Sequence, residues 1–382
     1  MRLLPPSAVL SGVRVLLRGE LARYSTDGNS EASLFERELS RLVGVDRALG
    51  LNSGTSGLIC ALVGVGVGPG DEVLVPAYTW VSSAASVLAV GAIPVLVEID
   101  RSLTIDPADI ARKITPHTKA IIPVHMQNVP SDMDAILALA KQHGLVVIED
   151  ACQAVGVSYH GRALGSIGDV GVFSYQQYKN IYSGEGGALV TNDSRIYTRA
   201  RMYHDVGSYT RLEKLDGNEP LFAGVNLRMP ELSAAILRPQ LKLLAGKIEH
   251  LKAHRRLAIK RLQSSRFAAR FELSPHHDPD AAAGLSVYFD DPEDAREFAG
   301  SSRGVTRLIE TGRHVYTNWE SLKSKRPAHP SLDPWSWAHQ PIEFTADTCP
   351  RTLEILARTC LIPLRLEMPT FVYRAWLLRS IP

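Results

Sequence analysis

Short apolar segments alternate with helical patterns through the first half of the chain, and this alternation constrains the fold more than any other feature. Strands that alternate with helices predict a mostly parallel sheet covered by helices on both faces. The expected strands are residues 48–51, 71–76, 93–98, 120–124, 145–148 and 187–191, with another that ends at Ser174. The expected helices are residues 30–43, 81–90, 106–114 and 132–143, with another that begins at Leu58.

Five of the predicted strands are followed by a side chain that can contact a ligand. In open parallel sheets, ligands bind beyond the carboxyl ends of the strands. We therefore expect a functional site at this edge of the sheet. The residues concerned are Thr55, Trp80, His125, Asp150 and Ser174.

Length and composition limit the classes of function. The chain has 382 residues, 45% of them hydrophobic, which suits a globular protein of two domains. We place a large domain at residues 1–247 and a smaller C-terminal α+β domain at residues 248–382. The net charge of +2 argues against a nucleic-acid partner. No apolar run approaches the ~20 residues that span a membrane, so no membrane partner is expected.

Other segments exclude further classes. The N-terminus has no signal-peptide pattern and the four cysteines form no Cys-x-x-Cys pair, so we expect a cytoplasmic protein. The glycine-rich residues 64–70 follow a helix instead of a strand, which argues against a nicotinamide-dependent oxidoreductase. Residues 275–280 contain two histidines, but their prolines favour an exposed turn, and no metal site is expected.

One lysine, Lys179, lies between a strand that ends at Ser174 and a glycine-rich turn. Residues 52–57 form a second glycine-rich turn, and they predict an anion site at a helix N-terminus, where Thr55 and Ser56 add hydroxyl groups. With Asp150, these parts match pyridoxal phosphate, which needs a Schiff-base lysine, an acidic partner for its ring nitrogen and an anion cradle.

The motifs occur in a family order. They are Asn-Ser-Gly-Thr-Ser-Gly at 52–57, the block from Gly70 to Trp80, Glu-Asp-Ala-Cys-Gln at 149–153, Phe-Ser-Tyr with Lys179 and the turn at 184–187, and Asn-Leu-Arg-Met at 226–229. In these motifs the chain resembles the DegT/DnrJ/EryC1/StrS family of pyridoxal-phosphate aminotransferases. The resemblance implies an α/β fold of the type I, aspartate aminotransferase-like class, and covers residues 30–241 best.

The resemblance also implies roles for individual residues. Lys179 would hold the cofactor as a Schiff base and later move the proton, and Asp150 would pair with the ring nitrogen. Gln153 would contact the ring-oxygen side, and Trp80 would stack on the ring. The phosphate would be bound by Thr55, Ser56 and Ser174, together with Asn226 from a second subunit, so that the active sites lie at a homodimer interface.

The implied reaction moves an amino group from an amino acid, glutamate or glutamine, to a keto or aldehyde sugar carried on a nucleotide, in amino-sugar biosynthesis. Arg228 is a candidate for the donor carboxylate, and His314, Tyr316 and Trp319 are candidates for the acceptor. Residues 127–130 replace the Tyr-Gly that is more common in the family, which suggests an altered substrate pocket.

Two alternatives remain. A cyclitol aminotransferase of the scyllo-inosose type would use the same cofactor on another acceptor. A non-catalytic regulatory or binding relative would keep the fold alone, but the intact Lys179, Asp150 and Ser174 argue against it.

Overall fold

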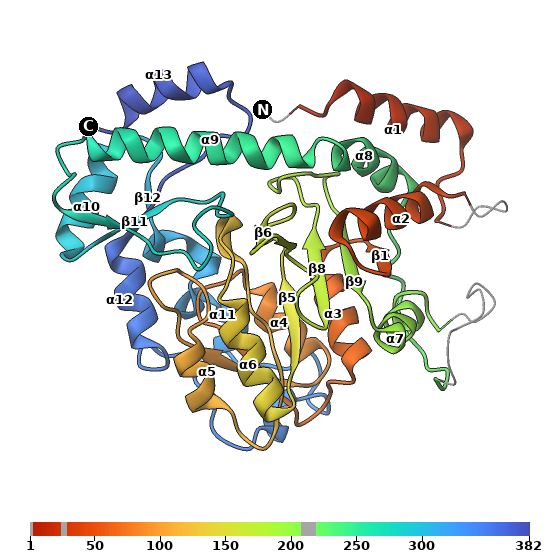
Figure 1. The fold of residues 1–382 in the computed structure, drawn as a ribbon. Coiled ribbons are helices and arrows are strands. Elements are labelled where there is room, and N and C mark those ends of the chain that lie inside the picture. Colours follow the sequence, from red (N-terminus) through yellow and green to blue (C-terminus); the bar gives the residue numbers. More distant parts are fainter. Residues whose placement is uncertain (1–2, 24–28, 208–218) are drawn as a thin grey trace.

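A seven-stranded sheet forms the centre of the protein in the computed structural model, which describes residues 3–23, 29–207 and 219–382 (Figure 1). Its strand order is β1-β9-β8-β5-β4-β2-β3. The strands are β1 Arg47–Leu51, β2 Glu72–Pro76, β3 Ile93–Val97, β4 Thr118–Ile121, β5 Val146–Asp150, β8 Val170–Ser174 and β9 Gly187–Thr191. β9 runs antiparallel to both of its neighbours and the other pairs are parallel, so the predicted mostly parallel sheet is present.

Helices pack against the sheet, which explains why its strands lack polar alternation. Every residue of β2, β3, β8 and β9 is buried, as expected for strands covered on both faces. The helices of this part are α2 Glu31–Val43, α3 Gly54–Val65, α4 Ser82–Ala89, α5 Pro107–Lys113, α6 Met133–His143 and α7 Ser194–His204. Of these, α7 was not predicted.

The helix α3 begins four residues earlier than the sequence predicted. Ser53 caps it by accepting a hydrogen bond from the Ser56 N–H, so residues 54–57 form its first turn instead of a loop before it. A Cβ at Gly57 would lie 2.5 Å from Val172 Cγ1 in β8. The glycine therefore lets α3 rest directly on the strand that ends at Ser174.

A second, antiparallel sheet lies in the C-terminal part, with strand order β10-β11-β13-β12. The strands are β10 Phe271–Leu273, β11 Ser286–Phe289, β12 Thr306–Arg307 and β13 Thr359–Leu361, and the helices here are α10 Pro292–Ser301, α11 Glu320–Lys323, α12 Pro350–Arg358 and α13 Thr370–Ser380. This C-terminal part has its own apolar cluster, which contains Phe267, Phe289 and Phe298. This is the predicted small α+β unit.

The two sheets are joined by the long helix α9 Leu244–Gln263, which crosses the upper part of the molecule in Figure 1. The helix α8 Glu231–Leu241 precedes α9. The predicted boundary at residue 247 falls inside α9. The helix α1 Pro6–Arg18, which was not predicted, packs through Gly12 on Leu232 and Ile236 of α8.

Short elements complete the described chain. They are the hairpin β6 Ser158–Tyr159 and β7 Arg162–Ala163, and the 3-10 turns Met126–Asn128, Leu308–Glu310, Gly312–His314, Tyr316–Asn318 and Pro334–Trp337. In the described ranges, none of the helices combines the length and apolar character that crossing a bilayer requires.

Glu149 organises the loop that leads into β8. Its carboxylate accepts hydrogen bonds from the backbone N–H groups of Gly165 (2.8 Å), Ile167 (2.6 Å) and Gly168 (2.6 Å), and it lies 3.1 Å from His125 Nε2. Both side chains are fully buried. His125 therefore supports the fold from inside, although the sequence had placed it among the residues of the ligand-binding edge.

Replacing Glu149 with alanine should destabilise the protein strongly, because three N–H groups, two of them buried, and His125 would lose their partner. We expect a loss of about 3–5 kcal/mol in the free energy of unfolding, measured by urea denaturation followed by circular dichroism. The control is Glu354→Ala, which removes an exposed ion pair with Arg358 and should change stability by less than about 0.5 kcal/mol. Equal effects of the two substitutions would contradict this role of Glu149.

Candidate active site

A cavity of about 840 Å³ opens beyond the carboxyl ends of β5 and β8. The last residues of these strands, Asp150 and Ser174, line it, together with the first turn of α3 and with Lys179. Residues 361–364, from the C-terminal sheet and the segment after it, form part of its wall. The cavity is therefore at the sheet edge that the strand-end residues predicted, and it is completed by the second sheet.

The Asp150 carboxylate is held by a chain of buried groups. Its Oδ2 accepts a hydrogen bond of 2.8 Å from Ser83 Oγ, and its Oδ1 accepts one of 3.1 Å from the Cys152 N–H. Thr79 Oγ1 lies 2.8 Å from Ser83 Oγ and supports it in turn. Burial and the charge of Asp150 raise the pKa of the Cys152 thiol well above its usual value, which keeps that thiol neutral. The carboxylate is thus oriented as a hydrogen-bond acceptor.

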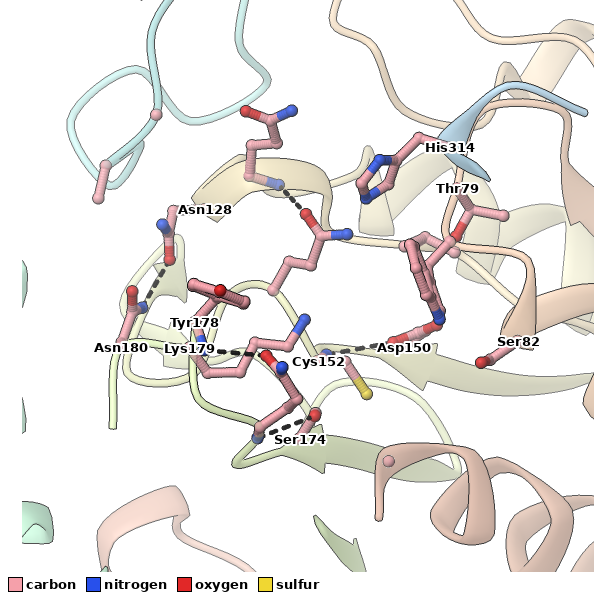
Figure 2. Close-up of a pocket in the computed structure, with 18 of the residues that line it drawn as sticks. Thr79, Ser82, Asn128, Asp150, Cys152, Ser174, Tyr178, Lys179, Asn180 and His314 are labelled. Carbon is pink, nitrogen blue, oxygen red and sulfur yellow. Dashed lines mark hydrogen bonds between the residues drawn. The ribbon is translucent and has the colours of Figure 1, made fainter. Parts of the chain in front are cut away.

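Lys179 follows a tight turn that starts at the end of β8. Its backbone N–H donates to the Gln176 carbonyl (2.9 Å), and Gln177 N–H donates to the carbonyl of Gly184, which has a positive φ of 92°. Figure 2 shows the Lys179 amine inside the cavity, between Asp150 on one side and Asn128 and Asn180 on the other. A nucleophile and a fixed carboxylate therefore share one cavity.

The first turn of α3 provides a place for an anion. Its free N–H groups and helix dipole favour negative charge, and Thr55 and Ser174 add hydroxyls that line the cavity. Thr55 Oγ1 donates to Ser82 Oγ (2.9 Å). Ser56 is buried just outside the lining, where its hydroxyl donates to Asn52 Oδ1 (2.6 Å). Ser56 therefore supports the turn, and its side chain does not face the cavity.

Trp80 forms the flat wall of the cavity. It is 40% exposed, and the His314 ring packs against it with 5.3 Å between ring centroids. Burial lowers the pKa of His314, and the nearby charge of Lys179 lowers it further, so we expect a neutral imidazole at pH 7. On another side, Gln153 Oε1 accepts a hydrogen bond from Gln127 N–H (3.3 Å). Both Gln153 and His314 thus line the cavity, and their contacts with the cofactor and the acceptor stay predictions.

Tyr316 and Trp319, predicted as acceptor contacts, are instead buried in the core. Tyr316 OH donates to the Thr345 carbonyl (2.9 Å), and Trp319 Nε1 donates to the Arg313 carbonyl (2.8 Å). Neither lines the cavity, because each polar atom is satisfied inside the protein and the ring fills apolar space. This prediction is therefore wrong.

Asn226 and Arg228 also lie outside the cavity lining. Asn226 is exposed, and Arg228 forms an ion pair with the buried Asp205. A role for Asn226 across a subunit interface agrees with this exposure and stays a prediction. Arg228 is held by Asp205, so its role with the donor carboxylate also stays a prediction.

Several lining residues were missed by the sequence analysis. Ser83 and Thr79 hold Asp150, while Gln127, Asn128 and Asn180 form one wall of the cavity. Ser83 and Thr79 could have been predicted from the hydroxyl-rich residues 79–83, which lie just after a strand. Gln127 and Asn128 belong to residues 127–130, whose departure from the family pattern had suggested an altered pocket, whereas Asn180 had no signal of its own.

The residues present fit pyridoxal phosphate. A cradle at a helix N-terminus suits its phosphate, an amine suits its aldehyde, and a fixed carboxylate suits its ring nitrogen. A Cβ at Gly54 would lie 2.9 Å from both Cys152 Sγ and Ser174 Cβ. Because this position has no side chain, the backbone at the start of the helix can lie directly against these two residues of the cavity lining. No group of His, Cys, Asp and Glu side chains in the described ranges is arranged to hold a metal ion.

Curated relatives match more than half of the chain. GDP-perosamine synthase of Caulobacter vibrioides is 43% identical over 227 residues, or 58% of each chain. The L-glutamine:2-deoxy-scyllo-inosose aminotransferase of Streptoalloteichus tenebrarius is 42% identical over 252 residues, or 62% of this chain and 58% of the relative. The matches thus span less than two thirds of these relatives.

Solved structures match over nearly the whole chain. The structure of S. venezuelae DesV in complex with a ketimine intermediate is 31% identical, with a TM-score of 0.74, and the match covers 97% of this chain and 91% of that one. The structure of 3-amino-5-hydroxybenzoic acid synthase is 28% identical, with a TM-score of 0.78 and coverage of 99% and 96%. These matches confirm the aspartate aminotransferase-like fold.

The family model agrees with both groups of relatives. Residues 17–304, which include Lys179, Asp150 and the first turn of α3, match it. The family predicted from the five motifs is therefore confirmed: the chain belongs to the DegT/DnrJ/EryC1/StrS aminotransferase family.

Proposed function

We propose that the protein is a pyridoxal-phosphate-dependent aminotransferase that moves an amino group from an amino acid to the carbonyl carbon of a sugar. The observation that carries this proposal is the meeting of the Lys179 amine, the fixed Asp150 carboxylate and the helix-terminal anion cradle in one cavity. The ketimine complex of the 31% identical structure and the family match support the cofactor.

The cofactor and the residues have separate tasks. Pyridoxal phosphate, when bound, supplies an electron sink for charge that develops at the Cα of the amino acid. Lys179 would hold the cofactor through its amine and, once released, would take the proton from the donor Cα. Asp150 would keep a proton on the ring nitrogen, and Ser83 holds the Asp150 carboxylate in place. Thr55, Ser174 and the α3 N–H groups would hold the phosphate.

The donor we propose is L-glutamate or L-glutamine, and the acceptor is a keto or aldehyde sugar linked to a nucleotide. The names of the relatives support this choice, since one is a GDP-perosamine synthase and another is a transaminase of a dTDP-linked sugar. A cyclitol ketone is the second candidate acceptor. It is favoured by the match to the 2-deoxy-scyllo-inosose enzyme, which extends over more residues than the match to the GDP-perosamine enzyme.

We also propose a homodimer with the active sites at the interface. Two features support it. Asn226 is exposed, and α1 presents an exposed apolar face that includes Val9, Leu10, Val13, Leu16 and Leu17. The cytoplasmic location remains a prediction from the sequence. Sedimentation analysis at assay concentration should show a dimer, and a monomer that retains full activity would contradict the shared site.

Replacing Lys179 with alanine should abolish amino transfer while the phosphate cradle remains. The loss of the proton-transfer group alone should lower the rate by about 10²–10⁴-fold. The yellow adduct of protein and pyridoxal phosphate, which borohydride traps at Lys179 in the wild type, should not form at this position. Absorbance and peptide mass measurements test both points, and undiminished turnover in the variant would show that another amine is used. A wild-type protein that forms no adduct would favour the non-catalytic relative.

Replacing Ser83 with alanine should weaken the hold on Asp150 without moving the backbone. A hydrogen bond to a charged group stabilises that group and fixes its orientation. Without it, the donor half-reaction should slow by about 10–100-fold, which stopped-flow absorbance measures. Asp150→Asn should slow it at least as much. Ser86→Ala is the matched control, because Ser86 lies on the same helix and its hydroxyl donates only to the Ser83 carbonyl. If the Ser83 and Ser86 variants behaved alike, the support of Asp150 by Ser83 would be refuted.

A further inference from the structure

One turn in the cavity wall has an unusual backbone. Gln127 and Asn128 are consecutive non-glycine residues with positive φ angles of 52° and 64°. Left-handed backbone is uncommon outside glycine, and two such residues in sequence need support from their surroundings. Both line the cavity that contains Lys179. Backbone strain of this kind gathers at functional sites, which makes the turn a candidate for a role of its own.

The turn is held from three sides. Gln127 and Asn128 donate their N–H groups to Gln153, at the side-chain Oε1 (3.3 Å) and the backbone carbonyl (3.1 Å). The Asn128 carbonyl accepts a hydrogen bond of 3.0 Å from Ala283 N–H. A Cβ at Gly284 would lie 2.1 Å from the Gln127 carbonyl oxygen, so the loop before β11 presses on the turn. The backbone of the turn is therefore held in place by the protein itself.

The hydrogen-bond network determines which amide atoms remain for a ligand. Asn180 Nδ2 donates to Asn128 Oδ1 (2.7 Å) and to the Val155 carbonyl (3.0 Å), so the group that Asn128 has to offer is its Nδ2 amide. Gln127 Nε2 donates to Tyr78 OH (3.2 Å), which leaves Oε1 as an acceptor. The wall thus presents a donor beside an acceptor. A hydroxyl group both donates and accepts, whereas a phosphate only accepts.

The position of this wall connects it to the reacting carbon. Asn180 directly follows Lys179 in the chain, and Figure 2 shows Asn128 and Asn180 on the side of the lysine opposite Asp150. Of the described residues around the cavity, Lys179, Asp150 and Glu185 are those of the Asp, Glu, Lys and Arg types. The first two are assigned to the cofactor, so the polar groups left for the acceptor are Glu185, His314, hydroxyl groups and the neutral amides, which include Gln127, Asn128 and Asn180.

We propose that Gln127, Asn128 and Asn180 form the specificity-determining wall for the amino acceptor, and that they recognise ring hydroxyl groups next to its carbonyl. This inference rests on the proposed aminotransferase function and names the part of the substrate that these three side chains would bind. A sugar ring on a nucleotide and a free cyclitol both carry such hydroxyls. The wall recognises the ring itself and leaves the activating group to other parts of the site.

The test uses Asn128→Gly, because glycine keeps the left-handed backbone and removes only the amide. The full-length protein with pyridoxal phosphate is first converted to its amino form with L-glutamine or L-glutamate, and the absorbance change gives the donor half-reaction. The amino form is then mixed with scyllo-inosose in one arm and with dTDP-4-keto-6-deoxyglucose in the other. The arm in which the wild type reacts identifies the source of the ring.

We expect the variant to lose about 10–100-fold in kcat/KM for that acceptor, mainly through a higher KM, while the donor half-reaction changes by less than about threefold. Its thermal midpoint should stay close to that of the wild type. The matched control is His160→Gly, at an exposed left-handed residue outside the cavity lining, which should leave the acceptor kinetics unchanged.

Two results would overturn the inference alone: unchanged acceptor kinetics in Asn128→Gly, or an equal loss in the donor and acceptor half-reactions. A wild-type protein that completes the donor half-reaction and passes the amine to neither ring ketone would overturn it as well. In contrast, a wild-type protein with no donor half-reaction would refute the proposed function and, with it, this inference.

Discussion

The N-terminus of α3 rests against the ends of β8 and β9, and the cavity depends on this contact. Side chains at three positions would prevent it. A Cβ at Gly57 would meet Val172, one at Gly187 would lie 2.2 Å from the Ser53 carbonyl oxygen, and one at Gly54 would meet Ser174. With larger residues the helix would have to move outward, and its free N–H groups would leave the neighbourhood of Ser174. The anion cradle can therefore form because these three positions are glycines and carry no side chain.

Two adjacent acidic residues at the end of β5 show how one strand serves both structure and chemistry. Successive side chains of a strand point to opposite faces of the sheet. Glu149 turns into the interior, where it fixes the loop at residues 165–168 that leads to β8. Asp150 lines the cavity and is fixed by Ser83. The buried Glu149 carboxylate thus positions the strand that presents Ser174. The neighbouring Asp150 carboxylate faces the cavity, where it can contact a cofactor.

The two ends of the cavity are built from different parts of the chain. The end with Lys179, Asp150 and the α3 terminus comes from the edge of the large sheet, where every residue of β8 and β9 is buried. The other end is formed by the turn at residues 127–128 and by the segments at 283–285 and 361–364. This arrangement would allow the proposed acceptor wall to differ between relatives without a change in the residues proposed for the proton transfer.

The sequence alone determined the parallel sheet, its reactive edge and the residues at the strand ends, because short buried strands and glycine-rich turns leave local patterns. It could not separate His125 from Asp150, since both follow strands and only tertiary packing shows that His125 faces Glu149. For the same reason it mistook Tyr316 and Trp319 for site residues. An aromatic side chain with one polar atom suits either a cavity or a core, and the choice is made by distant carbonyl groups that satisfy that atom.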